Sequence, residues 1–189
     1  MKKRMEHPLS VFRYCPRCGG AHFEINNEYS KKCRDCGFTY YANPSSATAA
    51  FIVRDDEILV VRRAKDPARG TLDLPGGFVD MDEDDRQAVR REIREETGLE
   101  MQSCQLLFTI PNLYTYSGMD IHTLDMFYVC QPQDGAEPVA ADDAADCQWM
   151  KISDLVPGDF GLMSIRQAVA RFIESVTCHG GQILSGIPR

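Results

Sequence analysis

The sequence predicts an α/β (α+β) fold in which a mixed sheet is sandwiched by helices, with a small cysteine-rich module before it. Three observations predict this arrangement. Two Cys-x2-Cys pairs lie close together within residues 15–36. Short apolar runs with strand character recur between residues 47 and 130. Two segments, one within residues 77–99 and the other at residues 164–176, repeat their apolar side chains with a helical period.

The composition is that of an ordinary globular chain. Hydrophobic residues make up 43% and charged residues 26% of the 189 positions, which allows one domain with a real core plus a small module. The net charge of −7 excludes a global basic field that would recruit nucleic acid, although a local basic patch stays open. The sequence contains no run of 18 apolar residues, and its basic N-terminus is not followed by an apolar segment. We therefore expect a cytoplasmic protein with no membrane partner.

Four of the eight cysteines are spaced like metal ligands. Cys15, Cys18, Cys33 and Cys36 form two knuckles, each followed by glycine. Four thiolates at this spacing can close a tetrahedral shell around Zn²⁺, and such a short segment needs metal binding to fold. We interpret it as a zinc ribbon of two small hairpins, with a structural Zn²⁺ because no coordination position stays open. The alternative is a pair of disulfides or thiols without metal.

The chain divides at residues 40–44, which join the ribbon to a second domain. We expect a zinc ribbon with an N-terminal extension at residues 1–41, a larger domain at 42–178 and a mobile tail at 179–189. The larger domain begins with strands at 47–53 and 57–63, on either side of a turn at Asp55-Asp56. A short strand at 71–74 then leads into the turn Pro75-Gly76-Gly77.

A helix is predicted after this turn. Ala88, Val89 and Ile93 form its apolar stripe, and Gly98 occupies the position of a helix C-cap. Acidic residues fall near its first turn, where negative charge suits a helix N-terminus. These residues are Asp82, Asp84 and Asp85.

The acidic residues farther along this helix are unusual. Glu92, Glu95 and Glu96 share one helical face, and like charges in this spacing destabilise a helix unless a cation neutralises them. Arg91 and Arg94 are next to these glutamates in the sequence, but we expect their side chains to point away from the glutamate face. Clustered carboxylates are the ligands of Mg²⁺ or Mn²⁺, which commonly bridge them to substrate phosphates. The alternative is a solvated, salt-bridged helix.

The remaining elements follow in order. We expect a strand at 105–110 that Pro111 interrupts, a loop at 111–120, and a strand at 122–130. An acidic linker then precedes a short strand at 148–150, one helical turn at 152–156 and the helix at 164–176.

The segment around the acidic helix resembles the Nudix box, G-x5-E-x7-R-E-U-x-E-E-x-G-U, where U is a bulky aliphatic residue. Its fixed positions are all met, by Gly77, Glu83, Arg91, Glu92, Ile93, Glu95, Glu96, Gly98 and Leu99. The resemblance implies an α/β/α sandwich and a metal-dependent hydrolase that cleaves nucleoside diphosphates linked to another group. It further implies two sets of site residues. The catalytic set is Glu92, Glu95, Glu96 and Arg91, and the Mg²⁺ or Mn²⁺ ligands are Glu92, Glu95, Glu96 and the carbonyl of Gly76.

A four-cysteine ribbon directly before a Nudix-like domain resembles the NADH pyrophosphatases, and the likeness covers roughly Cys15 to Trp149. That family carries a substrate signature after its box, which places substrate-binding residues on the loop after residue 110. They are Pro111, Tyr114, Tyr116 and Ser117. The alternative is that the two tyrosines simply pack the loop. An outer metal ligand, six residues before the tryptophan, falls on Asp143, where the family has glutamate.

The resemblance thus implies a pyrophosphohydrolase acting on NADH, NAD⁺ or ADP-ribose, with an RNA 5′ end as a further substrate and a homodimer as the assembly. A non-catalytic ligand sensor is the alternative, in which the zinc ribbon contacts nucleic acid or a protein partner. Basic residues on the ribbon, Lys31, Lys32 and Arg34, motivate that alternative.

Overall fold

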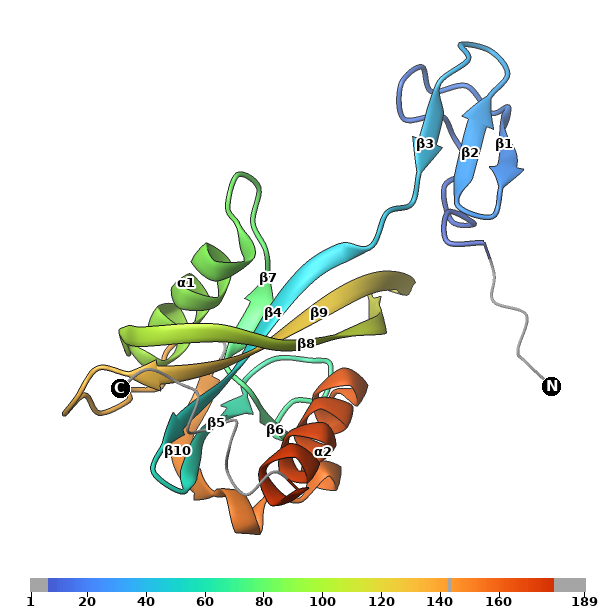
Figure 1. Cartoon of the computed structure of the whole chain (residues 1–189). Coiled ribbons are helices and arrows are strands. Elements are labelled where there is room, and N and C mark those ends of the chain that lie inside the picture. The colour runs from blue at the N-terminus through green and yellow to red at the C-terminus, as the bar shows by residue number, and fades with distance from the viewer. Residues whose placement is uncertain (1–6, 143, 179–189) are drawn as a thin grey trace. The chain divides into compact units, whose positions relative to one another are not determined.

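The computed structural model describes residues 7–142 and 144–178 (Figure 1). It divides into two compact units, one formed by Met1–Ser45 with Leu113–His122, and the other by Ser46–Asn112 with Thr123–Arg189. The tail predicted at residues 179–189 lies outside the described residues. Neither helix of the described residues combines the length and the hydropathy of a membrane-spanning segment.

The first unit contains a small antiparallel sheet. Its strands are β1 (Phe23–Asn27), β2 (Ser30–Cys33) and β3 (Thr39–Tyr41), in the order β1-β2-β3. The two predicted hairpins therefore share β2 and form one sheet. Among the described residues, the hydrophobic cluster of this unit contains buried Cys15, Phe23 and Cys33, with Cys36 and Phe38 partly buried against them. Two of the candidate zinc ligands, Cys15 and Cys33, belong to this core. A core of this size stabilises little on its own.

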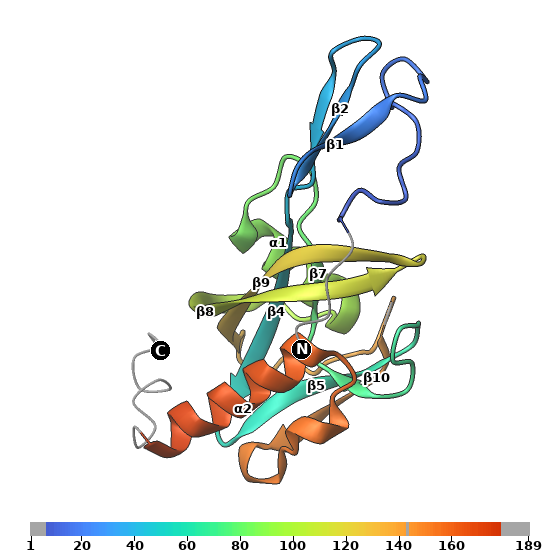
Figure 2. The same ribbon diagram turned by 90° about the vertical axis from the view of Figure 1, so that its right-hand side faces the viewer.

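The second unit is built on a larger mixed sheet between two helices, as predicted (Figure 2). The main path of the sheet runs β10-β5-β4-β9-β8, with β6 paired to β5 and β7 paired to β4. The strands are β4 (Ser45–Arg54), β5 (Glu57–Arg63), β6 (Leu72–Asp73), β7 (Gly76–Phe78), β8 (Met101–Tyr116), β9 (Met119–Pro132) and β10 (Ala144–Lys151). The short 3₁₀ helices η1 (Ile152–Asp154) and η2 (Pro157–Asp159) follow β10.

The central strand β4 faces a helix on each side. Its residues Ala49, Phe51 and Val53 pack in one core with helix α2 (Met163–Cys178), where Phe51 stacks on Phe172 with ring centroids 4.2 Å apart. Its residues Ala50 and Ile52 pack in a second core with helix α1 (Asp85–Thr97). This alternation follows from the two-residue period of a strand and explains why β4 is continuously apolar from Ala49 to Val53.

The prediction that Pro111 interrupts a strand was wrong. Strand β8 continues through Pro111 to Tyr116, and the predicted loop is the tip of a β8–β9 hairpin. Proline is accepted here because β8 lies at the end of the strand order, where a missing N–H need not cost a ladder hydrogen bond. The two hairpin turn residues, Ser117 and Gly118, both have positive φ, 49° and 74°, as a tight hairpin turn requires.

Candidate active site

Helix α1 is closed at both ends by local contacts, and the C-cap predicted at Gly98 is confirmed. The Asp84 carboxylate accepts hydrogen bonds from the backbone N–H groups of Arg86 and Gln87, and the Gln87 side chain accepts one from Asp84 N. Gly98 ends the helix in the left-handed conformation, with φ of 69°. The buried residues Ala88, Val89 and Ile93 press the helix onto the sheet. The apolar face of α1 is therefore held against the sheet, which fixes the direction in which its polar face points.

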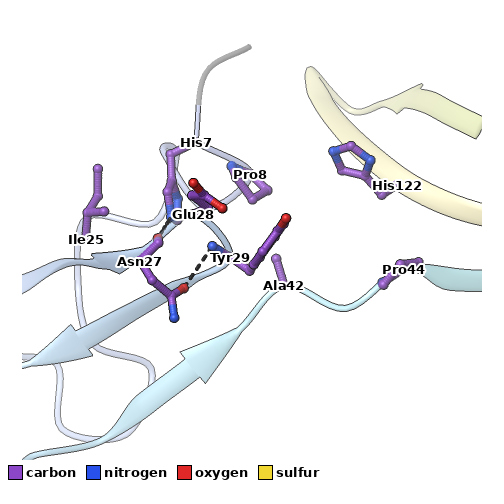
Figure 3. A pocket seen from close by; sticks show the side chains of 9 residues that line it. All are labelled: His7, Pro8, Ile25, Asn27, Glu28, Tyr29, Ala42, Pro44 and His122. Carbon is purple, nitrogen blue, oxygen red and sulfur yellow. Dashed lines mark hydrogen bonds between the residues drawn. The ribbon is translucent and has the colours of Figure 1, made fainter. Parts of the chain in front are cut away.

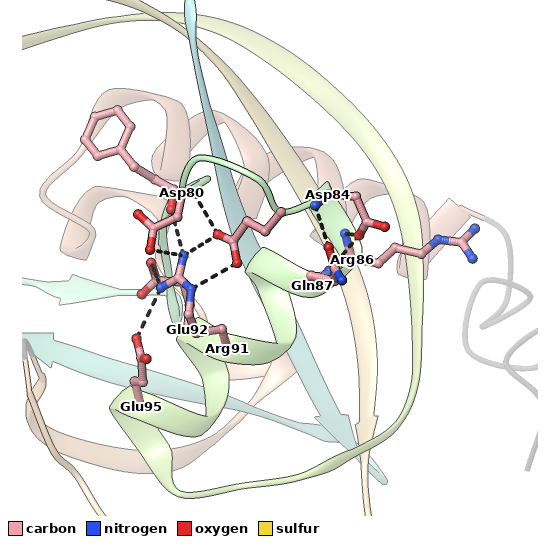
Figure 4. A network of polar contacts seen from close by, with 9 residues as sticks. Asp80, Asp84, Arg86, Gln87, Arg91, Glu92 and Glu95 are labelled. Carbon is pink, nitrogen blue, oxygen red and sulfur yellow. Dashed lines mark hydrogen bonds and ion pairs between the residues drawn. The ribbon is translucent and has the colours of Figure 1, made fainter.

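Arg91 organises the carboxylates at the start of this helix and along its polar face (Figure 4). Its guanidinium donates to Glu83 at 2.5 and 3.1 Å, to Glu92 at 2.8 Å and to Glu95 at 3.2 Å. It also donates to the carbonyl of Phe78 at 3.1 Å. The expectation that Arg91 points away from the glutamates was wrong, because its long side chain brings the guanidinium within hydrogen-bonding distance of Glu92, the next residue, and of Glu95, one turn farther along the helix.

Two glycines before the helix bring the backbone close to the glutamates. A Cβ atom on Gly77 would stand 2.4 Å from Glu92 Oε1, so only glycine leaves that carboxylate its place. The N–H of Gly76 donates to Glu96 Oε2 at 3.1 Å. Gly76 has φ of 156°, and a Cβ atom there would stand 2.1 Å from the carbonyl oxygen of Thr48. The predicted turn is thus a short strand, β7, that lies against β4.

Burial separates these glutamates from those of a solvated helix. The Glu92 side chain is 15% exposed and Glu96 is 7% exposed, whereas the Glu95 side chain is 44% exposed. Burial raises the pKa of Glu92, against the hydrogen bond from Arg91, which lowers it. That same Arg91 hydrogen-bonds Glu83 and holds the pKa of Glu83 below its usual value. Glu83 therefore serves as the paired partner of Arg91, while Glu92 is a carboxylate that a nearby cation would stabilise.

These donors fit Mg²⁺ or Mn²⁺. Both ions prefer oxygen ligands, and the site offers the carboxylates of Glu92, Glu95 and Glu96 beside the glycine backbone. Gly76 and Gly77 lack the Cβ atoms that would fill the space next to Glu92 and β4. The predicted outer ligand Asp143 lies outside the described residues. The segment just before it is tied to α1, because Ala141 N donates to the carbonyl of Glu96 at 2.9 Å.

The four cysteines of the ribbon also come together. Cys15 and Cys36 have their sulfur atoms 3.7 Å apart, as do Cys18 and Cys33, and all four lie within 4.8 Å of one another. Among residues 7–142 and 144–178, this is the group of metal-binding side chains whose ligand atoms converge. The glutamates are engaged by Arg91 and Gly76 instead. Four sulfur donors at these separations fit a closed tetrahedral Zn²⁺ site.

The ribbon histidines take no part in that cluster. His22 contacts Asp35 at 2.8 Å. His7 lines a hollow of the first unit, together with Asn27 and Tyr29 (Figure 3). Its Nδ1 accepts from Leu9 N at 3.1 Å, so its Nε2 carries the proton donated to the Asn27 carbonyl at 2.8 Å. Both ring nitrogens are thus used within the ribbon.

The predicted substrate residues lie on the β8–β9 hairpin. Tyr114 and Tyr116 are stacked, with ring centroids 6.4 Å apart and planes at 15°. Ser117 forms the hairpin turn, and Pro111 lies earlier in β8. Their contact with substrate stays a prediction.

The sequence matches a known domain family and several known proteins. The sequence pattern of the NUDIX domain matches residues 43–172. The chain is 33% identical over 150 residues to the ADP-ribose pyrophosphatase of Methanocaldococcus jannaschii, a match that covers 75% of this chain and 86% of that protein. It is 23% identical over 151 residues to the NAD-capped RNA hydrolase NudC of Vibrio parahaemolyticus, covering 80% of this chain and 55% of that one. The chain thus spans about half the length of that relative.

A solved structure supports the fold. The NUDIX hydrolase from Nitrosomonas europaea superimposes with a TM-score of 0.68 at 20% identity, covering 86% of this chain and 91% of that chain. At this identity the likeness concerns the fold alone.

Proposed function

The chain belongs to the NUDIX family, and on that premise we propose that it is a metal-dependent pyrophosphohydrolase of ADP-ribose or an NAD-like dinucleotide. The observation that carries this proposal is the arrangement of Glu92 and Glu96. Both carboxylates are largely buried beside glycine backbone, where a divalent cation would offset their charge. We further propose that the ribbon holds structural Zn²⁺ and that the chain belongs to the ribbon-containing NADH pyrophosphatase group.

Each residue of the site has a separate task. A divalent cation, when bound, neutralises the diphosphate oxygens and acidifies water. Glu92, Glu96 and the Gly76 carbonyl would hold this cation, and Glu95 and Asp143 would be further ligands. Arg91 fixes the directions of Glu92 and Glu95 through its two hydrogen bonds. A carboxylate of this set accepts the proton of the attacking water.

The substrate panel that tests this proposal contains ADP-ribose, NADH, NAD⁺ and dinucleoside polyphosphates, each with Mg²⁺. We expect nucleoside monophosphate products from at least one of them. Tight binding of a panel member without any product would favour a ligand sensor and contradict the hydrolase. The buried carboxylates argue against a sensor, since ligand recognition alone needs no cation-binding set.

A second substrate, the NAD-capped 5′ end of RNA, is favoured by the charge of the ribbon. The first 45 residues carry eight Lys and Arg against four Asp and Glu, a net charge of +4, while the rest of the chain carries −11. Tyr14, Tyr29, Tyr40 and Tyr41 are exposed there, and such rings can stack on unpaired bases. Of the basic residues named from the sequence, Lys32 is exposed, whereas Arg34 pairs with Glu24 at 2.6 Å.

Lys31 takes no part in this surface. It is 8% exposed, and its ammonium donates to the carbonyl of Phe12 at 2.5 Å.

The exposed Lys32 offers a test of RNA binding by the ribbon. Substitution Lys32→Glu should slow hydrolysis of NAD-capped RNA and leave free NAD⁺ hydrolysis unchanged. Equal loss with both substrates would contradict RNA docking on the ribbon. The homodimer and the cytoplasmic location stay predictions.

A further inference from the structure

A buried hydroxyl group on strand β4 has no use in the fold. Thr48 is 3% exposed, and within the described part of the chain its Oγ1 has no hydrogen-bond partner. A buried hydroxyl without a partner costs free energy, and valine has nearly the same shape without that cost. The other buried positions of β4 between residues 49 and 53 are all apolar. Packing alone therefore does not explain a threonine here.

The register of β4 and β7 gives the direction in which this hydroxyl lies. Thr48 pairs directly with Gly77, and directly paired residues project from the same face of a sheet. A Cβ atom on Gly77 would meet the Glu92 carboxylate, with 2.4 Å to Oε1 and 2.6 Å to Cδ. Ala50, two residues along β4, packs on that same side with Val89 and Ile93 of α1. The Thr48 side chain thus faces the space beside Glu92.

The Thr48 side chain and the Glu92 carboxylate are neighbours on this face of the sheet. Cβ atoms of directly paired residues lie about 4.5–5.5 Å apart, and the Glu92 carboxylate oxygens would stand 2.4 and 2.9 Å from a Cβ atom on Gly77. No direct hydrogen bond joins Thr48 to Glu92 among the described contacts. Neighbouring polar groups that do not bond directly are commonly joined by a bridging water.

We propose that Thr48 is a positioning residue of the candidate active site, whose hydroxyl hydrogen-bonds a water in the coordination shell of a divalent cation held by Glu92 and Glu96. Mg²⁺ keeps several of its waters when it binds protein carboxylates, and groups that hydrogen-bond the shell tune the affinity of the ion. The inference rests on the proposed function, because it needs a cation at these glutamates.

The test compares Thr48→Val, which removes only the hydroxyl, with Thr48→Ser, which keeps it. Mn²⁺ affinity is measured by titration calorimetry and by the electron paramagnetic resonance signal of the free ion. Thr48→Val should bind Mn²⁺ roughly three- to tenfold more weakly, the loss expected for one hydrogen bond. The melting temperature of its metal-free form should be unchanged or higher. Thr48→Ser should retain the affinity of the wild-type protein.

Thr123→Val is the matched control. Thr123 is also buried, at 4% exposure, but its hydroxyl already donates to Asp125 at 2.6 Å. This variant should melt at a lower temperature and bind Mn²⁺ like the wild-type protein.

Wild-type Mn²⁺ affinity in Thr48→Val, or equal losses in the valine and serine variants, would overturn the proposal, as would a wild-type protein that binds no Mn²⁺. Failure of the proposed function would give a different result. The wild-type protein would bind Mn²⁺ but hydrolyse no diphosphate. The Mn²⁺ affinities of the two Thr48 variants would still decide whether Thr48 positions the cation.

Discussion

Gly77 and Glu92 lie so close together that a methyl group on Gly77 would stand 2.4 Å from Glu92 Oε1. The atoms that would have to move are the free end of a side chain, which can swing away at small cost. The glycine therefore protects the position of a carboxylate more than it protects the fold.

Gly77→Ala should separate activity from stability. We expect the alanine to displace the Glu92 carboxylate and lower kcat/KM by about 100-fold, since small misplacements of catalytic groups are costly. The unfolding free energy should change by no more than about 1 kcal/mol. Urea titration and steady-state kinetics on one preparation check both values. A variant with wild-type kinetics would show that Glu92 needs no such position.

Gly76→Ala should behave in the opposite way. Its Cβ atom would stand 2.1 Å from the Thr48 carbonyl oxygen and 2.7 Å from Ala49 Cα, and its φ of 156° disfavours side chains. Because backbone cannot swing away, we expect a loss of about 2–5 kcal/mol in unfolding free energy. Gly158→Ala is the control, since its nearest contact would be 4.0 Å from a Val156 methyl. Equal stability of the two variants would be inconsistent with tight β4–β7 packing.

The pair formed by Arg91 and Glu83 predicts a pH dependence. The Arg91 hydrogen bond lowers the pKa of Glu83, so ionised Glu83 contributes stability above its unfolded pKa of about 4.3. That contribution is lost as the pH falls through the lowered folded pKa. The difference in melting temperature between wild type and Glu83→Gln should be full at pH 7 and shrink below about pH 4.3. A difference that is constant down to pH 2 would exclude this assignment.

Removal of zinc should affect the ribbon alone. The hydrophobic cluster that its described residues form is small, built on Cys15, Phe23 and Cys33, so we expect strands β1–β3 to lose amide protection when a chelator removes Zn²⁺. Amides of α1 should stay protected in the same hydrogen-exchange experiment. Cys18→Ser should reproduce the effect, and Cys147→Ser, outside the cluster, should not. Protein purified without zinc but with a protected ribbon would refute the site.

Features with local causes were predictable from the sequence. The capping of α1 depends on Asp84 and Gly98, which lie next to the helix, and the cysteine knuckles depend on short spacings. Features that depend on the order of strands in the sheet could not be predicted from the sequence. Pro111 fits into β8 because that strand ends the sheet, which no local pattern reveals.

Thr48 shows the same limit within the site. Its relation to Glu92 depends on its pairing with Gly77, 29 positions away along the sequence, and no motif contains it. The reach of Arg91 to Glu83 and Glu92 likewise depends on how the loop before α1 folds back. The family motif names these residues but does not give their contacts.

In the proposed mechanism, Glu92 and Glu96 hold a divalent cation against a diphosphate. The most direct measurement compares Mg²⁺-dependent hydrolysis of ADP-ribose by Glu92→Gln and Glu96→Gln with that by Glu100→Gln, which lies just beyond the same helix on an exposed side chain. We predict that kcat falls by more than about 100-fold in the first two variants and stays at the wild-type value in Glu100→Gln. Hydrolysis at the wild-type rate by either Glu92→Gln or Glu96→Gln would contradict the account.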